Sequence, residues 1–512
     1  LRSMEAINKE ALRLLRLFGN TTSKKVTPSV GAEQEYFLVD AEKFEERKDL
    51  IYTGRTLFGA MPPKGQELDD HYFGTIRQRI ASFMRDVNIQ LWKVGVPSKT
   101  QHNEVAPAQH ELAPIYTEAN IAVDQNQLTM QTLKRVACQH GLKCLLHEKP
   151  FAGVNGSGKH NNWSITTDDG INLLEPGKTP HENTQFLLVL ACIMKAVNVH
   201  ADLLRESAAD PGNDHRLGAN EAPPAIISIF LGEQLEDVVE QLISTGTATR
   251  SKTGEKLATG VKTLPDFMKD ATDRNRTSPF AFTGNRFEFR AVGSSANCAA
   301  AMIVLNSAVA HQLRLFKEEV DKKIQVGESK EKAIIRVLKK YIKESKPIRF
   351  DGNGYSDEWK AEAAARGLDC ETSTPVIFDA YIKPASVEMF SAVGVMNAVE
   401  LAARNEVKWE MYTKKIQIEA RVMGDLALNH ILPVATRYQA LLLDTVCKIK
   451  EVFPPEEAAA MSSKDMEIIR KIARHTLSIQ EMVATMVNAR KLANKIEGER
   501  AKAIAYHDTV AP

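Results

Sequence analysis

Two glutamates, Glu33 and Glu35, lie one residue apart in the apolar segment GAEQEYFLV at 31–39. The segment has the pattern of a β-strand, on which alternate side chains leave the same face, so both carboxylates point the same way. Two like charges that close repel each other and are costly to bury unless a cation lies between them. A solvated strand face is the alternative, but Ala32 and Tyr36 make this strand too apolar for a plain surface edge. The fold must therefore place an acidic strand face against water or against a divalent metal.

A second acidic pair, Glu104 and Glu111, flanks the sequence VAPAQH. Pro107 excludes a regular helix and requires a turn or bulge. The two carboxylates then either converge from a bent strand or a strand pair, or belong to a polar loop. His102 and His110 suggest zinc, but no helical His-x-x-x-His motif is present and the proline argues against that geometry.

A glycine-rich segment, FAGVNGSGKH at 151–160, is close to a phosphate-binding loop. That loop needs Ser or Thr where His160 stands, and Pro150 interrupts the strand expected before it, so we reject this interpretation. Glycines still let the backbone approach a ligand closely, so Asn155 and Gly156 are candidates to hold a small polar substrate. His160 is either a metal ligand or a hydrogen-bonded histidine of the core.

Arginines alternate with a glutamate in NRFEFR at 285–290, which follows Arg274 and Arg276 along the chain. On a strand, Arg286, Glu288 and Arg290 share one face and two phenylalanines share the other. A ladder of salt bridges is one interpretation. The other is phosphoryl transfer, since guanidinium groups suit phosphate and carboxylate oxygens and a glutamate between them can bind a metal.

The composition excludes several classes of function. A net charge of +1 argues against a dedicated nucleic-acid binder. The six cysteines form no Cys-x-x-Cys pair, which favours reduced thiols in a cytoplasmic protein. The most apolar stretch, 294–313, contains Ser, Asn, His and Gln, so we expect a buried alanine-rich helix and no membrane partner.

The chain is predicted to be an α+β catalytic body followed by a helical region. An amphipathic helix at 4–18 and a polar linker at 21–28 precede the body, and residues 407–507 are almost wholly helical in pattern. We predict domain boundaries at 1–27, 28–400 and 401–512. Within the body we predict a strand at 225–231 and helices at 121–142, 183–207, 294–323, 330–346 and 387–404.

Six segments together resemble glutamine synthetase, most closely its large type III bacterial form, and they occur in the family's order. The segments are 31–37, 103–111, 155–160, 216–221, 274–276 and 286–290. The resemblance runs from about residue 28 to 300, and more loosely into the helical tail. It implies a glutamine-synthetase-type catalytic domain, with a curved antiparallel sheet flanked by helices, and a helical C-terminal region. The family's β-grasp domain has no counterpart before residue 28, and type III forms continue beyond Pro512, so truncation at both ends is implied.

The resemblance also implies an activity. The expected reaction is ATP-dependent ligation of ammonia to L-glutamate through γ-glutamyl phosphate, with two or more Mg²⁺ or Mn²⁺ ions and ATP as co-substrate. Self-association into a ring-type homo-oligomer, a dodecamer, is implied as well. Two alternatives stay open: a non-catalytic assembly or regulatory protein of similar fold, and a γ-glutamyl ligase for a larger amine.

The family's roles carry over to particular positions of this sequence. The resemblance implies one metal on Glu35, Glu104 and Glu111, and another on Glu33, His160 and Glu288. It implies glutamate binding by Asn155, Gly156, Arg216 and Arg290, and phosphate contacts by Arg276 and Arg286. Glu221 and Tyr72 would serve the ammonium pocket, and Asn162, Ser164 and Tyr116 would contact the nucleotide. Lys159 departs from the pattern, because many relatives have an uncharged residue there.

Overall fold

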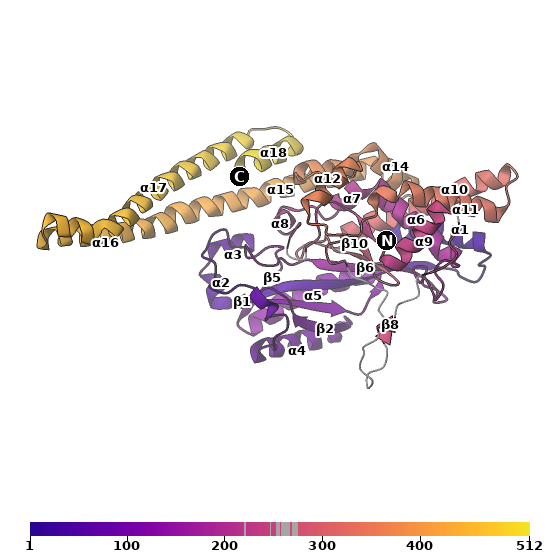
Figure 1. Cartoon of the computed structure of the whole chain (residues 1–512), viewed down its shortest axis with the longest axis horizontal. Coiled ribbons are helices and arrows are strands. Elements are labelled where there is room, and N and C mark those ends of the chain that lie inside the picture. Colours follow the sequence, from indigo (N-terminus) through magenta and orange to yellow (C-terminus); the bar gives the residue numbers. More distant parts are fainter. Residues whose placement is uncertain (220–221, 246, 252–255, 258–266, 269–274) are drawn as a thin grey trace. The chain divides into compact units, whose positions relative to one another are not determined.

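The structure is a computed structural model of residues 1–512 that describes every residue except 220–221, 246, 252–255, 258–266 and 269–274. Contacts divide the chain into two compact units. The larger unit comprises Leu1–Glu42 and Ala60–Asn405, and the smaller unit comprises Lys43–Gly59 and Glu406–Pro512. The larger unit contains the β-sheet, and the smaller unit is helical (Figure 1).

The larger unit is built on a nine-stranded sheet with the order β2-β3-β1-β6-β11-β10-β7, in which β4 and β5 also pair with β1. The sheet is antiparallel, as predicted, except that β7 and β10 are parallel at one end. Its strands are β1 (Val26–Asp40), β2 (Ser98–Asn103), β3 (Gln109–Pro114), β4 (Thr117–Glu118), β5 (Leu142–Leu145), β6 (Lys159–Thr167), β7 (Ile229–Phe230), β10 (Phe280–Phe282) and β11 (Phe287–Phe289). A separate pair consists of β8 (Lys256–Leu257) and β9 (Phe267–Met268).

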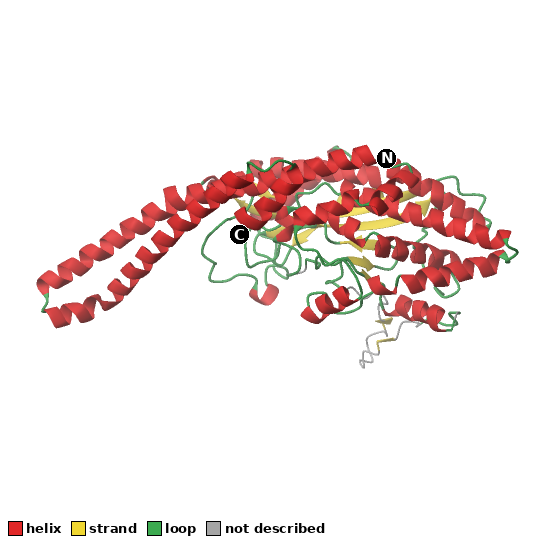
Figure 2. Ribbon diagram, turned by 90° about the horizontal axis from the view of Figure 1, so that it is seen from above, coloured by secondary structure: helices red, strands yellow, loops and turns green. Residues whose placement is uncertain are grey.

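Helices border this sheet (Figure 2). The α-helices of the larger unit are α1 (Arg2–Leu15), α4 (Gln78–Lys93), α5 (Ala119–Gln139), α6 (Thr184–Val199), α7 (Ala201–Glu206), α8 (Pro211–Asp214), α9 (Glu233–Ser244), α10 (Ala299–Gln325), α11 (Lys330–Glu344), α12 (Asp357–Ala365), α13 (Thr374–Ile377) and α14 (Pro384–Ala392). Short 3-10 turns are η1 (Arg16–Phe18), η2 (Glu67–Asp69), η3 (Lys346–Ile348) and η4 (Phe378–Ile382). Side chains cap several N-termini, as Asn183 does for α6 and Ser329 for α11.

Strand β1 separates the core from the candidate site, because alternate side chains leave opposite faces. Val30 and Tyr36 are fully buried on the face that the helices cover. There, one hydrophobic cluster joins α1, α6 and α10 to the sheet, and a second joins α4 and α5 to it. Glu33 and Glu35 leave the other face. The acidic side chains therefore lie on the side of the sheet away from these two clusters.

Most of the predicted helices and strands are present. The exceptions are a helix that is interrupted near Gly394 and a strand that is reduced to β7. The helices predicted at 121–142, 294–323 and 330–346 correspond to α5, α10 and α11. The helix predicted at 387–404 is wrong: α14 ends before Gly394, whose φ of 70° is left-handed, and a new helix begins at Ala398. The strand predicted at 225–231 is only the two residues of β7.

One helix among the described residues, α10, is long and apolar enough to cross a membrane by length and composition. However, 67% of its apolar window is buried inside the protein. It packs in the main hydrophobic cluster through residues such as Val309 and Leu313. This agrees with the buried alanine-rich helix predicted for 294–313.

The smaller unit is helical. Its long helices are α15 (Ala398–Leu426), α16 (Leu432–Val452) and α17 (Pro455–Ala493), and its short helices are α2 (Ala41–Glu45), which continues from the larger unit, α3 (Lys48–Thr53) and α18 (Glu499–Ala505). Two π-helical turns, η5 (Ala427–Ile431) and η6 (Tyr506–Val510), complete it. Leu442 and Val446 of α16 pack on Ile469 of α17. The segment before Ala60 joins this unit through Arg55, which makes two hydrogen bonds of 2.7 and 2.8 Å to the carboxylate of Glu419.

Candidate active site

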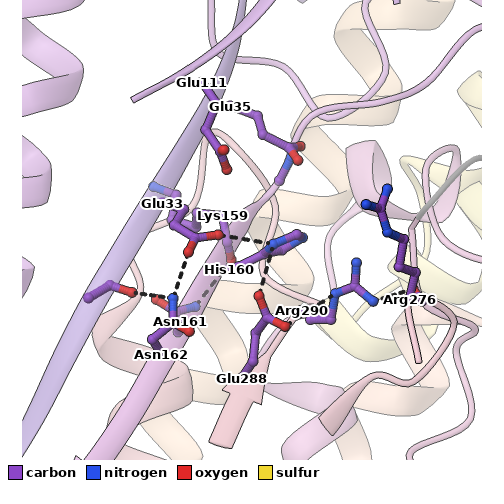
Figure 3. Close-up of polar contacts among 12 residues, drawn as sticks. Glu33, Glu35, Glu111, Lys159, His160, Asn161, Asn162, Arg276, Glu288 and Arg290 are labelled. Carbon is purple, nitrogen blue, oxygen red and sulfur yellow. Dashed lines mark hydrogen bonds and ion pairs between the residues drawn. The ribbon is translucent and has the colours of Figure 1, made fainter. Parts of the chain in front are cut away.

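Strands β1, β3 and β11 bring acidic side chains, and β6 brings His160, from distant parts of the chain to one face of the sheet (Figure 3). Glu33 is the cross-strand partner of His160, and Glu35 is the partner of Glu111. Glu288 enters from β11 on the other side of β6. The register of the sheet therefore gathers residues that are up to 255 positions apart in the sequence.

His160 lies between two carboxylates. Its Nδ1 is 3.2 Å from Glu33 Oε2 and 3.3 Å from Glu288 Oε1. Burial alone would lower the pKa of His160, but the hydrogen bonds to Glu288 and Glu33 outweigh burial and raise it to about 10. The pKa of Glu33 is lowered, because hydrogen bonds from His160 and Asn162 outweigh the effect of its burial. A protonated imidazole thus neutralises this part of the site.

A second imidazole, His102, lies beside Glu104 and Glu111. His102 Nε2 is 2.7 Å from Glu111 Oε2, and its Nδ1 is 3.6 Å from Glu104 Oε1. The hydrogen bond to Glu111 raises the pKa of His102 to about 9. Burial raises the pKa of Glu111, and the nearby carboxylates of Glu33 and Glu35 add to this effect. The pair Glu104 and Glu111 converges from the strand pair β2 and β3, one of the two arrangements left open above.

Ligand atoms come within 4.8 Å of one another in two groups among the described residues. One group is Glu33, Glu111 and His160, and the other is His102, Glu104 and Glu111. Glu111 is common to both, so the two groups adjoin. Glu35 belongs to neither group, and its Oε2 accepts a 2.6 Å hydrogen bond from the backbone N–H of Gly158. His102, which the sequence analysis considered for zinc and argued against, thus lies among the ligand candidates.

The glycine-rich loop forms one wall of a small cavity. Its lining is Glu35, Glu104, Gln109, Asn155, Gly156, His160, Arg216 and Ala222. A Cβ atom at Gly156 would lie 2.3 Å from the backbone oxygen of Glu148, so no larger residue fits there. Arg216 is buried and donates to backbone oxygens, including that of Arg290 at 3.2 Å. Three of the four predicted glutamate-binding residues thus line one cavity together with metal-ligand candidates.

Arg276 and Arg290 lie at one side of the acidic group (Figure 3). Arg290 Nε is 3.9 Å from Glu288 Oε2 and is buried without a hydrogen-bond partner among the described residues. A terminal nitrogen of Arg290 donates to the backbone oxygen of Arg276. Arg286 Nε donates to Asn162 Oδ1 at 3.1 Å. Arg290 therefore lies beside Glu288, Arg276 contacts Arg290, and Arg286 contacts Asn162.

The remaining predicted residues differ in how close they come to this group. The ring of Tyr72 packs edge-on against His102, with 6.0 Å between ring centroids. The hydroxyl of Ser164 donates to Asn172 Oδ1 at 2.9 Å and to the backbone oxygen of Asn285 at 3.0 Å, so it already has partners within the fold. Tyr116 is largely exposed. Glu221 and Arg274 lie outside the described residues.

Two glutamines of the site were not singled out from the sequence. Gln109 Nε2 donates to the backbone oxygen of Gly156 at 2.8 Å and to Ser157 Oγ at 3.0 Å. Gln66 makes two hydrogen bonds with Asn155. Gln109 lies within a motif quoted above, so its place beside Glu111 is a signal that could have found it, whereas nothing in the sequence marks Gln66.

Lys159 lies on the opposite face of β6 from His160. Its side chain is fully buried, and Nζ donates to Asn126 Oδ1 at 2.9 Å and to the backbone oxygen of Ala296 at 2.6 Å. Burial lowers the pKa of Lys159 to about 8. A lysine that points away from the site agrees with the rejection of a phosphate-binding loop.

Comparison with known proteins gives matches along the whole chain. Residues 13–201 match the family model described as "Glutamine synthetase, catalytic domain", and residues 333–450 match "Glutamine synthetase C-terminal domain". A glutamine synthetase of Bacteroides fragilis (strain YCH46) is 50% identical over 514 residues, which cover 100% of this chain and 70% of that protein. A type-3 glutamine synthetase of Dictyostelium discoideum is 44% identical, and a glutamine synthetase of Butyrivibrio fibrisolvens is 42% identical. Each of these two covers 100% of this chain, with 69% and 72% of their own lengths matched.

Proposed function

The chain belongs to the glutamine synthetase family, and from this premise we propose how its residues carry out the reaction. It is a glutamate–ammonia ligase that forms glutamine with the use of ATP and divalent metal. The names of its relatives favour ligation over a non-catalytic assembly role, and ammonia over a larger amine as acceptor.

The acidic group suits two divalent ions. We assign one to Glu33, His160 and Glu288, and the other to Glu35, Glu104 and Glu111. The support is a set of buried or half-buried carboxylates gathered around the imidazoles of His160 and His102. A donor set rich in oxygen with few imidazoles suits Mg²⁺ or Mn²⁺ better than zinc. Such ions would offset negative charge on phosphoryl and carboxylate oxygens.

The reaction needs an activated carboxylate, because glutamate itself would have to expel oxide. Transfer of the γ-phosphoryl group of ATP gives γ-glutamyl phosphate, from which ammonia displaces phosphate. Arg276, Arg286 and Arg290 border the acidic group and would donate to the phosphoryl oxygens as charge moves between them. The buried Nε of Arg290, which has no hydrogen-bond partner among the described residues, is a donor available to a ligand.

We propose that Asn155, Gly156, Arg216 and Arg290 bind glutamate. The support is the cavity that the first three line beside Glu35 and His160. Tyr72, next to His102, and Glu221 would form the ammonium pocket, where an acidic group binds the cation and then accepts its proton. Asn162, Ser164 and Tyr116 are proposed to contact the nucleotide.

The observation that carries these assignments is the position of His160 between Glu33 and Glu288. Glu288→Gln keeps the size of the side chain and removes its charge. We expect glutamine formation to fall about 10²- to 10³-fold. The measurement is steady-state glutamine formation with ATP and Mg²⁺, with Glu118→Gln on the sheet-edge strand β4 as the control that keeps its activity. Unchanged glutamine production by Glu288→Gln would overturn the assignment of Glu288.

Two further properties are proposed from the resemblance. Copies of this chain are proposed to form a ring-type homo-oligomer, a dodecamer, whose mass light scattering would report. The protein is proposed to act in the cytoplasm, where its six free cysteines would stay reduced.

A further inference from the structure

Gln66 contacts the candidate glutamate-binding residue Asn155 from outside the glycine-rich loop. Gln66 Nε2 donates to Asn155 Oδ1 at 2.8 Å, and Gln66 Oε1 accepts from the backbone N–H of Asn155 at 2.9 Å. Asn155 is 4% exposed, whereas Gln66 is half-buried. The side chain of one residue thus meets both the backbone and the side chain of the other.

The segment that carries Gln66, residues 60–77, has a defined conformation. Leu68 and Asp69 adopt φ values of 68° and 50°, a left-handed conformation that non-glycine residues rarely adopt. Further along, His71 Nδ1 lies 2.7 Å from the backbone oxygen of Glu104, and the backbone oxygen of His71 accepts from Asn103 Nδ2 at 3.2 Å. The segment is therefore docked at two points, one at Asn155 and one at Glu104.

The bond to Gln66 determines which end of the Asn155 amide faces the cavity. An asparagine amide has an accepting oxygen and a donating NH₂ group on opposite sides. Because Gln66 occupies Oδ1, the Nδ2 group is left for a ligand, and it has no hydrogen-bond acceptor among the described residues. A carboxylate can only accept hydrogen bonds, so an amide turned the other way would repel it.

We propose that Gln66 is a positioning residue for substrate binding, which holds the Asn155 amide so that its NH₂ group faces a carboxylate of glutamate. The inference rests on the proposed function, in which Asn155 binds glutamate. Gln66 itself does not contact the substrate in this account; it acts through Asn155.

The test replaces Gln66 by Glu and by Ala and measures the KM for glutamate. Gln66→Glu keeps an acceptor for the backbone N–H of Asn155 but offers no donor to Asn155 Oδ1. The side-chain amide of Asn155 is therefore expected to flip, which turns its oxygen toward the cavity. We expect the KM for glutamate to rise about 10- to 100-fold in Gln66→Glu, the range for a lost hydrogen bond to a charged group. The rise in Gln66→Ala is expected to be smaller, because the amide is then free to take either orientation. The KM for ATP and the Tm are expected to stay unchanged.

If Gln66 serves only to dock its segment, the KM for glutamate is expected to rise more in Gln66→Ala than in Gln66→Glu. Loss of segment docking would affect Gln66→Ala, which loses both bonds, more than Gln66→Glu, which keeps one. An equal or larger effect in Gln66→Ala would therefore overturn the inference. Gln78→Glu, the same substitution at an exposed position of α4, is the control for added negative charge.

The same substitution in the Asn155→Ala background tests whether Gln66 acts by orienting Asn155 or by charge repulsion. The Asn155→Ala variant alone tests the proposed glutamate site. If Gln66 acts through Asn155, Gln66→Glu adds no further rise in KM to Asn155→Ala. Simple repulsion of glutamate by the new carboxylate would raise KM in both backgrounds and would contradict the inference. If Asn155→Ala alone leaves the KM for glutamate unchanged, the proposed glutamate site itself is wrong.

Discussion

Two imidazoles, those of His160 and His102, carry positive charge among the acidic side chains of the site. Each is held by carboxylates at hydrogen-bond distance. A metal ligand has to be a neutral imidazole, so a protonated histidine and a metal compete for the same carboxylates. At the scale of residues, this competition makes metal binding a proton-linked event.

We predict that Mg²⁺ or Mn²⁺ binding at pH 8 releases about one proton from His160, and more if His102 is also displaced from its carboxylates. The pKa of His160 is raised above its ordinary 6.5 to about 10, so its stabilising ion pairs are fully present below pH 6.5. They are lost as pH rises through about 10, and metal affinity should rise over the same interval. Calorimetry of metal binding in buffers of different ionisation enthalpy counts the protons. Heats that do not depend on the buffer would contradict this prediction.

The sequence indicated the individual residues of the site better than it indicated which of them contact one another. Glu33, Glu35 and Glu288 stand out because each lies in a strand pattern with apolar neighbours. The pairing of His102 with Glu111 depends on the turn between β2 and β3, where Ala108 takes a φ of 64° that no sequence pattern indicates. Gln66 meets Asn155 across 89 residues, and only the fold brings them together.

At the scale of elements, a buried polar network lies behind the strands that carry the proposed metal ligands. Lys159 Nζ donates to Asn126 Oδ1, and Asn126 Nδ2 donates to Gln34 Oε1 at 3.2 Å. Gln34 Nε2 in turn donates to Ser294 Oγ at 2.9 Å and to the backbone oxygen of Glu35 at 3.0 Å. The network ties β1, β6 and α5 together beneath the acidic face.

We predict that Lys159→Met changes how stability depends on pH. Burial lowers the pKa of Lys159 from its ordinary 10.5 to about 8, so the charged form is destabilised in the folded state. Between about pH 8 and 10.5 the unfolded chain binds more protons than the folded one, and stability rises with pH. The full gain is on the order of 3 kcal/mol, at about 1.4 kcal/mol for each pH unit between the two pKa values.

The unfolding free energy of Lys159→Met should not show this rise with pH, because methionine does not titrate. The measurement is the difference in unfolding free energy between variant and wild type in urea at pH 8 and at pH 10.5. Lys134→Met, at an exposed position of α5, is the control that keeps the wild-type dependence. Parallel pH profiles for Lys159→Met and wild type would refute the role of burial.

The elements that the sequence predicted correctly are those with a long, regular pattern. The apolar periodicity of α5, α10 and α11 extends over several turns, so their existence was clear. The break at Gly394 was missed because a single glycine within a helical pattern is often tolerated. Strand β7 is only two residues long, and its parallel pairing with β10 is a tertiary feature with no local signal.

At the scale of the whole molecule, the chain forms two units with separate hydrophobic clusters. We predict that Ile469→Ala destabilises the smaller unit by about 2–4 kcal/mol, since Ile469 is buried against Leu442 and Val446. Hydrogen exchange should become faster in α16 and α17, while β1 keeps its protection and glutamine formation at 25 °C is unchanged.

The neighbouring Ile468 is exposed, so Ile468→Ala is the matched control with little effect on exchange. If Ile469→Ala accelerates exchange equally in β1 and α17, the two units unfold as one. The inclusion of residues 43–59 in the smaller unit, through Arg55 and Glu419, is a contact over 364 residues that the sequence could not indicate.

Strand β1 hydrogen-bonds to four other strands, and this has a consequence for how the protein reaches its native state. A slip of one residue between β1 and β6 would turn Gln34 to the ligand face and take both glutamates to the other side. Of these registers, only the native one would then offer a divalent ion all of the proposed ligands. An ion bound there would stabilise the native register relative to the slipped ones, so we expect it to help select the correct strand pairing.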